Sequence, residues 1–187
     1  MRSRSAILLA GSALGAMLVA AMMWIGPTTA LGQSGSRVQS GSSTQSGTRG
    51  AAGSFEARFW NFLQTAKYQH WAPAPGQGDQ LYPGQSPHGA QLAMYLNRRA
   101  VTNPTELPGG SIIVKENYAD DGQTLMAVTV MYRSEGYDPE HNDWYWVKYN
   151  PDGSVAQNDG MLLAGRVGGC IDCHSSSTGE DFAFFND

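Results

Sequence analysis

The two cysteines of the chain lie close together near its C-terminal end, in the stretch Gly169-Cys170-Ile171-Asp172-Cys173-His174. Two thiols separated by two residues can each add to one of the two vinyl groups of a haem, which gives two thioether bonds. The adjacent His174 then lies beneath the iron and can supply an axial nitrogen. The motif therefore predicts one covalently attached c-type haem, held by Cys170, Cys173 and His174, with His174 as the metal ligand.

Other chemistry is open to the same two cysteines. A disulfide between Cys170 and Cys173 would close a very small loop and would add little stability. A thioredoxin-like redox pair normally accompanies a βαβ pattern, and the residues around this motif, thirteen from the C-terminus, predict none. A zinc site would need a fourth ligand and would leave the position of His174 unexplained. We favour haem attachment, because the chain has no other cysteine and begins with an export signal, described below.

The second axial position of such an iron is the next question. The tail that follows His174 contains no Met, His or Lys. A second protein ligand would have to come from earlier in the chain, from His70, His88, His141, Met94, Met126 or Met131. The three methionines lie in strand-like stretches, where filling the core is their usual role, and His88 follows Pro87 at the head of a strand, where we expect a turn or surface residue. The sequence therefore favours an open sixth position and a haem that binds small ligands.

Residues 1–32 have the pattern of a secretory signal peptide. Arg2 and Arg4 precede an uncharged apolar run, residues 6–25, which is followed by Pro27 and several small residues. The run is about twenty residues long, so an uncleaved membrane anchor is the alternative. In either case we expect the rest of the chain to lie outside the cytoplasm, in the periplasm or otherwise exported.

The part of the chain after the signal is acidic and begins with a linker. Residues 33–53 consist mostly of Gly, Ser, Thr and Gln, a composition typical of a flexible tether. From residue 33 onward the chain has ten basic and sixteen acidic residues, a formal net charge of −6. It contains no basic cluster, so neither a nucleic acid nor an anionic membrane is an expected partner. We expect the haem domain to span residues 54–187.

Periodicity in this domain predicts one helix and four strands. Ser54 can cap a helix over residues 55–68, in which apolar residues recur at helical spacing. A stretch rich in Pro and Gly then predicts a long loop. Strands are predicted at 89–96, 111–118, 124–132 and 144–149, with a hairpin turn at 120–122. Together these elements predict an α+β fold, mainly antiparallel β-sheet with an N-terminal helix and a C-terminal haem-attachment segment.

Five blocks of sequence, in this order, carry a resemblance to a known family. They are residues 87–89 (PHG), 94–97 (MYLN), 108–118 (PGGSIIVKENY), 143–146 (DWYW), and the terminal motif together with 181–185 (DFAFF). Over about residues 55–187 the chain resembles the cytochrome P-460 family. The resemblance implies a mostly antiparallel β fold, a C-terminal c-type haem, an iron with an open distal side and, often, a homodimer.

The resemblance implies one of two activities. Cytochromes P-460 oxidise hydroxylamine and carry an extra covalent link from a lysine to the haem ring, whereas cytochromes c′-beta lack that link and bind nitric oxide or carbon monoxide under an apolar, aromatic cap. Lys115 stands where the cross-linking, haem-binding lysine is expected. The strand pattern alone predicts a solvated Lys115 instead, because Ile112 and Val114 make the better buried row. Both interpretations of Lys115 stay open.

Oxidation of hydroxylamine also needs a base that accepts protons from the bound nitrogen. The resemblance implies a glutamate on the strand after the lysine strand, and residues 124–132 contain no carboxylate. We expect Glu116 to lie on the opposite face of its strand from the lysine, and Glu135 and Asp138 to be solvated loop charges. Asp143 is expected to be a turn residue before an aromatic run that belongs to the core.

These observations favour an exported mono-haem c-type cytochrome with an open distal site. It would bind nitric oxide or carbon monoxide, or act in the redox chemistry of nitrogen compounds. The alternative is an enzyme, a hydroxylamine-oxidising oxidoreductase with a lysine-cross-linked haem. The expected partners are a small-molecule ligand, a redox partner protein and a second copy of the chain.

Overall fold

The structure is a computed structural model that describes residues 53–179 and 181–186. The expected signal peptide (1–32), its alternative as an anchor (6–25) and the linker up to residue 52 lie outside the described residues. Within the described part of the chain, no helix is long and apolar enough to cross a membrane.

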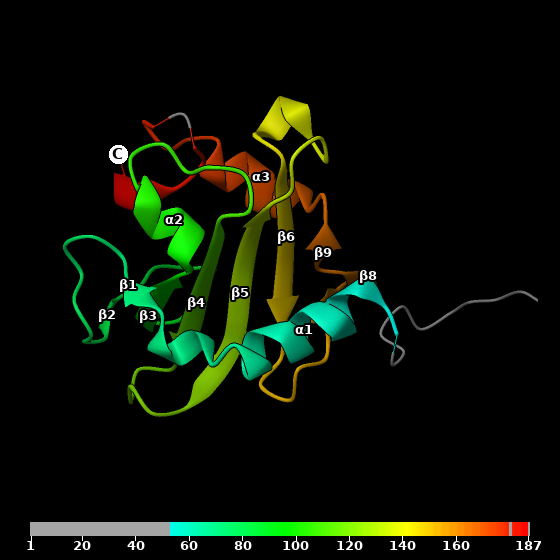
Figure 1. The fold of residues 1–187 in the computed structure, drawn as a ribbon. Helices are drawn as coiled ribbons and strands as arrows, with labels where there is room; N and C mark the ends of the chain where they lie inside the picture. The colour runs from blue at the N-terminus through cyan, green and yellow to red at the C-terminus, as the bar shows by residue number, and fades with distance from the viewer. Residues whose placement is uncertain (1–52, 180, 187) are drawn as a thin grey trace, which may run out of the picture. The chain divides into compact units, whose positions relative to one another are not determined.

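The centre of the fold is a sheet of seven antiparallel strands (Figure 1). Its strands run in the order β1-β3-β4-β5-β6-β9, and β2 also pairs with β3. Their bounds are β1 Ala72–Pro73, β2 Tyr82–Pro83, β3 Gln91–Leu96, β4 Ile112–Tyr118, β5 Leu125–Arg133, β6 Trp144–Tyr149 and β9 Ala164–Gly165. A separate two-stranded sheet is formed by β7 Gln157–Asn158 and β8 Met161–Leu162.

Short helices surround the sheet. In the part of the chain that the structure describes, the α-helices are α1 Phe55–Thr65, α2 Arg98–Thr102 and α3 Gly168–His174. The 3-10 helices there are η1 Tyr68–His70, η2 Pro139–His141 and η3 Phe184–Asn186. The predicted cap of the first helix is present, because the hydroxyl of Ser54 accepts a hydrogen bond from the backbone N–H of Ala57 at 3.2 Å.

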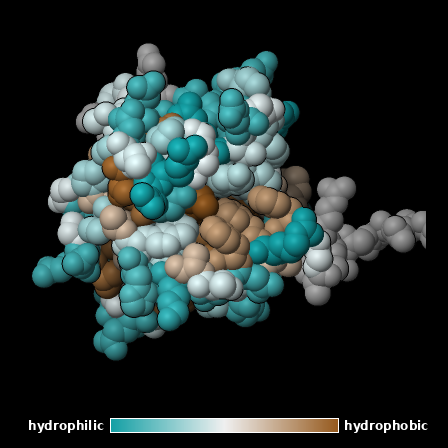
Figure 2. Space-filling model, in the orientation of Figure 1, coloured by the Kyte–Doolittle hydropathy of each residue, from teal (hydrophilic) through white to brown (hydrophobic). Residues whose placement is uncertain are grey.

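Helix α1 covers one face of the sheet. Neighbouring residues of a strand point to opposite faces, and on this face Phe59 and Leu63 of α1 pack against strand residues such as Val114. Figure 2 shows apolar surface over α1, where the rings of Phe55 and Phe62 remain exposed. This face therefore holds the larger aromatic core of the protein.

Helix α3 and the segment after it cover the opposite face. Ile171 of α3 and Ala183 pack with Ile113, Trp144 and Trp146 of the strands. Both faces of β4 are thus buried, and α3 brings the cysteine–histidine motif against the sheet.

The predicted α+β class is confirmed, and the four long strands lie within two residues of their predicted bounds. The hairpin turn also forms: Gly122 has a φ of +62°, and the N–H of Ala119 donates to the carbonyl of Thr124 at 2.9 Å. The first helix ends before its predicted limit, because Lys67 adopts the left-handed conformation and η1 replaces the last turn. The sequence pattern predicts neither α2 nor α3.

We predict that Gly153→Ala destabilises the protein more than Gly160→Ala does. Both glycines have a positive φ, 84° and 78°, a conformation that costs an L-residue about 1–2 kcal/mol. A Cβ at residue 153 would also overlap the indole of Trp60, whereas a Cβ at residue 160 meets nothing within 4 Å. The overlap should add about 1–3 kcal/mol to the loss, measured by chemical denaturation. Equal losses in the two variants would contradict the packing of Trp60 on this turn.

Candidate functional site

Helix α3 presents the cysteine–histidine motif. Cys170 and Cys173 are both free thiols, the first half-buried and the second exposed. Residues three positions apart are neighbours on a helix surface, so the two thiols lie on one side of a single turn. His174, the last residue of the helix, is 8% exposed. The motif therefore offers two free thiols beside a buried imidazole.

The imidazole of His174 is held in a defined orientation. Its Nδ1 lies 2.7 Å from the carbonyl oxygen of Phe182. A carbonyl oxygen can only accept a hydrogen bond, so Nδ1 carries the proton and Nε2 keeps a free lone pair. Burial, with a smaller contribution from Lys115, lowers the pKa of His174, and the accepting carbonyl opposes this shift. A neutral ring with a free Nε2 is the form that binds a metal.

Aromatic rings surround this imidazole. The ring centre of His174 lies 4.8 Å from that of Trp146, 5.3 Å from that of Phe184 and 6.2 Å from that of His88. The indole N–H of Trp146 is buried and has no hydrogen-bond partner among the described residues. The surroundings of the motif are thus largely apolar, with one buried donor beside the imidazole.

Lys115 lies on the same side of the sheet, contrary to the strand pattern. Its row, Ile113, Lys115 and Asn117, shares the face that α3 covers, whereas Val114 and Glu116 point toward the face of α1. The outward placement predicted from the pattern is wrong because both faces of β4 are covered. Burial lowers the pKa of Lys115 to about 8, and the nearby Cys173 thiol partly opposes this shift. Its amine is therefore far easier to deprotonate than that of a solvated lysine.

His88 joins the site through its side chain, which the sequence does not predict. The residue ends a turn, as expected, because its N–H donates to the carbonyl of Gln85 at 2.9 Å. Its ring, however, is half-buried, and its Nδ1 lies 2.9 Å from Oδ1 of Asn117. That oxygen also accepts from the N–H of Gly89, so Nδ1 of His88 is the donor. Burial and then Lys115 lower the pKa of His88 to about 4. Gly89 is the feature of the sequence that could have indicated this placement. A Cβ at residue 89 would overlap the backbone of Tyr118, so the glycine allows the chain beside His88 to approach β4 closely.

The carboxylates considered as proton acceptors lie elsewhere. Glu116 is on the opposite face from Lys115, as expected, where it accepts hydrogen bonds from the hydroxyls of Tyr68, Tyr95 and Tyr118. Asp138 is buried rather than solvated, and it pairs with His141 and Arg166. Glu135 is exposed, as expected, and lines a surface depression with Leu107, Arg133 and Asp143. The charged groups that shift the pKa values of His88, Lys115 and His174 are instead basic groups and a thiol.

The methionines and the remaining histidines were the other candidate ligands. Met131 fills the core and Met94 packs against it, as predicted, but Met126 is 56% exposed and does not. His70 is exposed, and the side chain of His141 pairs with Asp138.

The prediction for Asp143 and the aromatic run is confirmed. Asp143 has a φ of +61° and its carboxylate accepts from the N–H of Asp138, which makes it a turn residue. Trp144 and Trp146 are buried in the core of the α3 face. Trp146 also belongs to the candidate site, because its ring lies beside the imidazole of His174.

The donor set fits a haem better than a bare metal ion. Among the described residues, no group of three or more His, Cys, Asp or Glu side chains is arranged to hold a metal ion, so a zinc site has no support. Two free thiols on one helical turn, an imidazole with a free Nε2 and apolar rings around it match the requirements of a covalently held haem.

Comparison with known proteins agrees with this fit. No curated protein matches the chain at a significant level. The model of the family described as Cytochrome P460 matches residues 66–185, which is more than half of the chain. This match includes β3 to β6, Lys115 and the whole cysteine–histidine motif. The chain therefore belongs to the cytochrome P460 family of haem-binding cytochromes.

Proposed function

We propose that this protein is an exported mono-haem c-type cytochrome whose iron keeps one open coordination position for nitric oxide or carbon monoxide. The observation that carries the proposal is the hydrogen bond from Nδ1 of His174 to the carbonyl of Phe182, which leaves Nε2 free to bind iron. When bound, a haem supplies an iron that coordinates small diatomic ligands.

Each residue of the site has a part in this function. Cys170 and Cys173 would hold the haem through thioethers, and His174 would bind its iron through Nε2. Trp146 and Phe184 pack beside the imidazole and exclude water from it. Lys115 supplies a positive or neutral nitrogen within the same buried region. A site with these groups favours the binding of neutral ligands over chemistry in which protons must be transferred from the ligand to a carboxylate.

A second function is favoured by one observation, the placement of Lys115. Its buried amine lies on the side of the motif and has a pKa of about 8, so a nucleophilic neutral form is accessible for a link to the haem ring. Such a link would point to hydroxylamine oxidation. Against this, the charges that act on the site are basic groups and a thiol. A positioned general base contributes about a hundred- to ten-thousand-fold in rate. Glu116, Glu135 and Asp138 are not among the groups that act on the site, so under the gas-binding proposal we expect slow turnover of hydroxylamine.

We predict that the haem is covalent and depends on both thiols. After denaturing electrophoresis, the protein should stain for haem peroxidase activity, and the double variant Cys170→Ala, Cys173→Ala should lose the stain completely. The matched control is Asp172→Ala, which changes the residue between the cysteines and should keep the stain. Haem that is extracted from the unaltered protein by acidified organic solvent would contradict covalent attachment.

We predict that the two functions are separated by the Soret band of the ferrous protein. Under the gas-binding proposal, the bands of the unaltered protein and of Lys115→Arg coincide, because no lysine link perturbs the ring. A band of the unaltered protein far to the red of that of Lys115→Arg would show the link and support hydroxylamine oxidation. Lys148→Arg, a change of another basic residue that acts on His88, is the control and should leave the band in place.

We predict that His174 is the sole protein ligand of the iron. The ferric protein should then be high-spin or water-bound, the ferrous protein should take up carbon monoxide, and His88→Ala should not change the ferric spin state. His88 is the informative variant because its ring centre lies 6.2 Å from that of His174. His70→Ala, at an exposed histidine, is the control. A low-spin ferric spectrum that becomes high-spin only in His88→Ala would refute the open position.

A further inference from the structure

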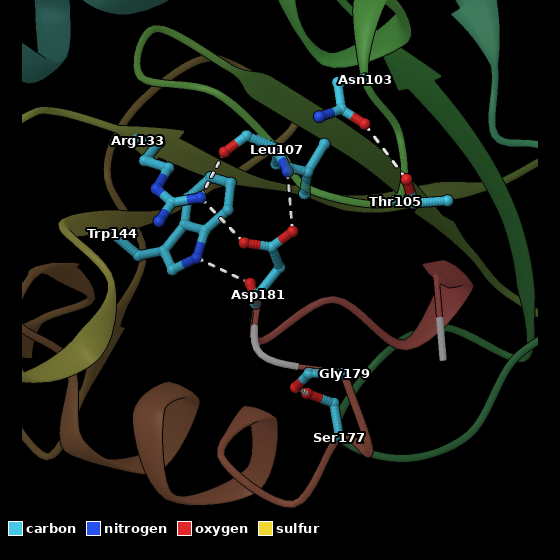
Figure 3. Close-up of polar contacts among 8 residues, drawn as sticks. All are labelled: Asn103, Thr105, Leu107, Arg133, Trp144, Ser177, Gly179 and Asp181. Carbon is cyan, nitrogen blue, oxygen red and sulfur yellow. Dashed lines mark hydrogen bonds and ion pairs between the residues drawn. The ribbon is translucent and has the colours of Figure 1, made fainter. Parts of the chain in front are cut away.

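Asp181 is the centre of a buried polar cluster that lies after the motif in the chain. Figure 3 shows its carboxylate and carbonyl receiving three hydrogen bonds. Oδ1 accepts from Nη1 of Arg133 at 2.8 Å, and Oδ2 accepts from the backbone N–H of Leu107 at 2.7 Å. The carbonyl oxygen of Asp181 accepts from the indole N–H of Trp144 at 2.8 Å. Residue 181 is thus fixed through its side chain and its backbone.

The partners of Asp181 are fixed as well. Arg133 ends β5, donates a second hydrogen bond to the carbonyl of Leu107 and lies over the ring of Trp144, 5.9 Å from its centre. Trp144 is fully buried, and the side chain of Asp181 is 7% exposed. Hydrogen bonds between charged groups in such surroundings are strong, and removal of one partner leaves the other charge buried and unpaired.

This cluster is joined to His174 by a single residue. Phe182 follows Asp181, adopts a left-handed φ of +59° and presents the carbonyl that accepts from Nδ1 of His174. A non-glycine residue keeps such a conformation only where its neighbours hold it in place. Asp181 holds it on one side, and the buried Ala183 holds it on the other.

We infer that Asp181 is a positioning residue for His174. Its carboxylate anchors the chain to Arg133 and Leu107, so that the carbonyl of Phe182 meets Nδ1 and fixes the rotation of the imidazole. A hydrogen bond at Nδ1 also makes Nε2 a stronger electron donor to a bound metal. The inference rests on the proposed ligation of iron by His174.

The test is Asp181→Asn in the haem-loaded protein, compared at equal haem stain. The amide turns a donor toward Arg133 or toward the N–H of Leu107, so one of the two contacts is lost. The hydrogen bond to Nδ1 should weaken as a result. The iron–imidazole stretching band of the ferrous protein, measured by resonance Raman, should shift to lower wavenumber, and the midpoint potential should rise.

The control and a second variant make the result decisive. Glu116→Gln also neutralises a buried carboxylate with several hydrogen bonds, but on the opposite face of the sheet, and should leave band and potential unchanged. Trp144→Phe keeps a buried ring, removes the bond to the carbonyl of Asp181 and should shift the band in the same direction. If Asp181→Asn does not fold, the shift of the band in Trp144→Phe tests the positioning role of Asp181.

Two negative results have different meanings. An unaltered protein without an iron–imidazole band would refute ligation by His174, and with it the proposed function. A normal band that stays unchanged in Asp181→Asn and Trp144→Phe would overturn the positioning role of Asp181 alone.

Discussion

Burial of both faces of β4 is the constraint on which the arrangement of the site depends. Ile113, Val114, Glu116 and Asn117 are all nearly inaccessible to water, although successive residues point in opposite directions. Two adjacent charged residues, Lys115 and Glu116, are therefore forced into different buried environments. Successive residues of β4 thus place a carboxylate on one face of the sheet and an amine on the other.

The two environments treat charge differently. Three phenol hydroxyls donate hydrogen bonds to the carboxylate of Glu116. Burial and this carboxylate raise the pKa of Tyr68 and Tyr118 far above the ordinary value. For Lys115 the main effect is burial, which removes water from the amine and lowers its pKa. The sheet thus places a carboxylate with several hydrogen bonds on one face and an amine that has lost most of its water on the other.

The parts of the fold that the sequence predicts are those with a strong local pattern. Strands β4 to β6 are rich in β-branched and aromatic residues, which favour strands. The spacing of Cys170, Cys173 and His174 has a chemical meaning of its own. The placement of Lys115 could not be predicted from periodicity, because its covering comes from α3 and the segment after it. The side-chain contact of His88 could not be predicted for a related reason: its partner Asn117 is distant in sequence and reaches it only through the pairing of β3 with β4. Met126 is exposed beside an irregularity in the pairing of β4 with β5, which no alternation pattern reveals.

The order of residues along the chain has a consequence for assembly. Helix α3 has seven residues and no side-chain cap at its start, so alone it would be marginal in water. The residues that fix its histidine, Asp181 and Phe182, follow it in the chain, while the core under α1 is complete without them. During synthesis the two thiols therefore emerge before the carbonyl of Phe182 that orients the imidazole. The hydrogen bond that fixes His174 can form only after the residues that follow α3 have packed against the sheet.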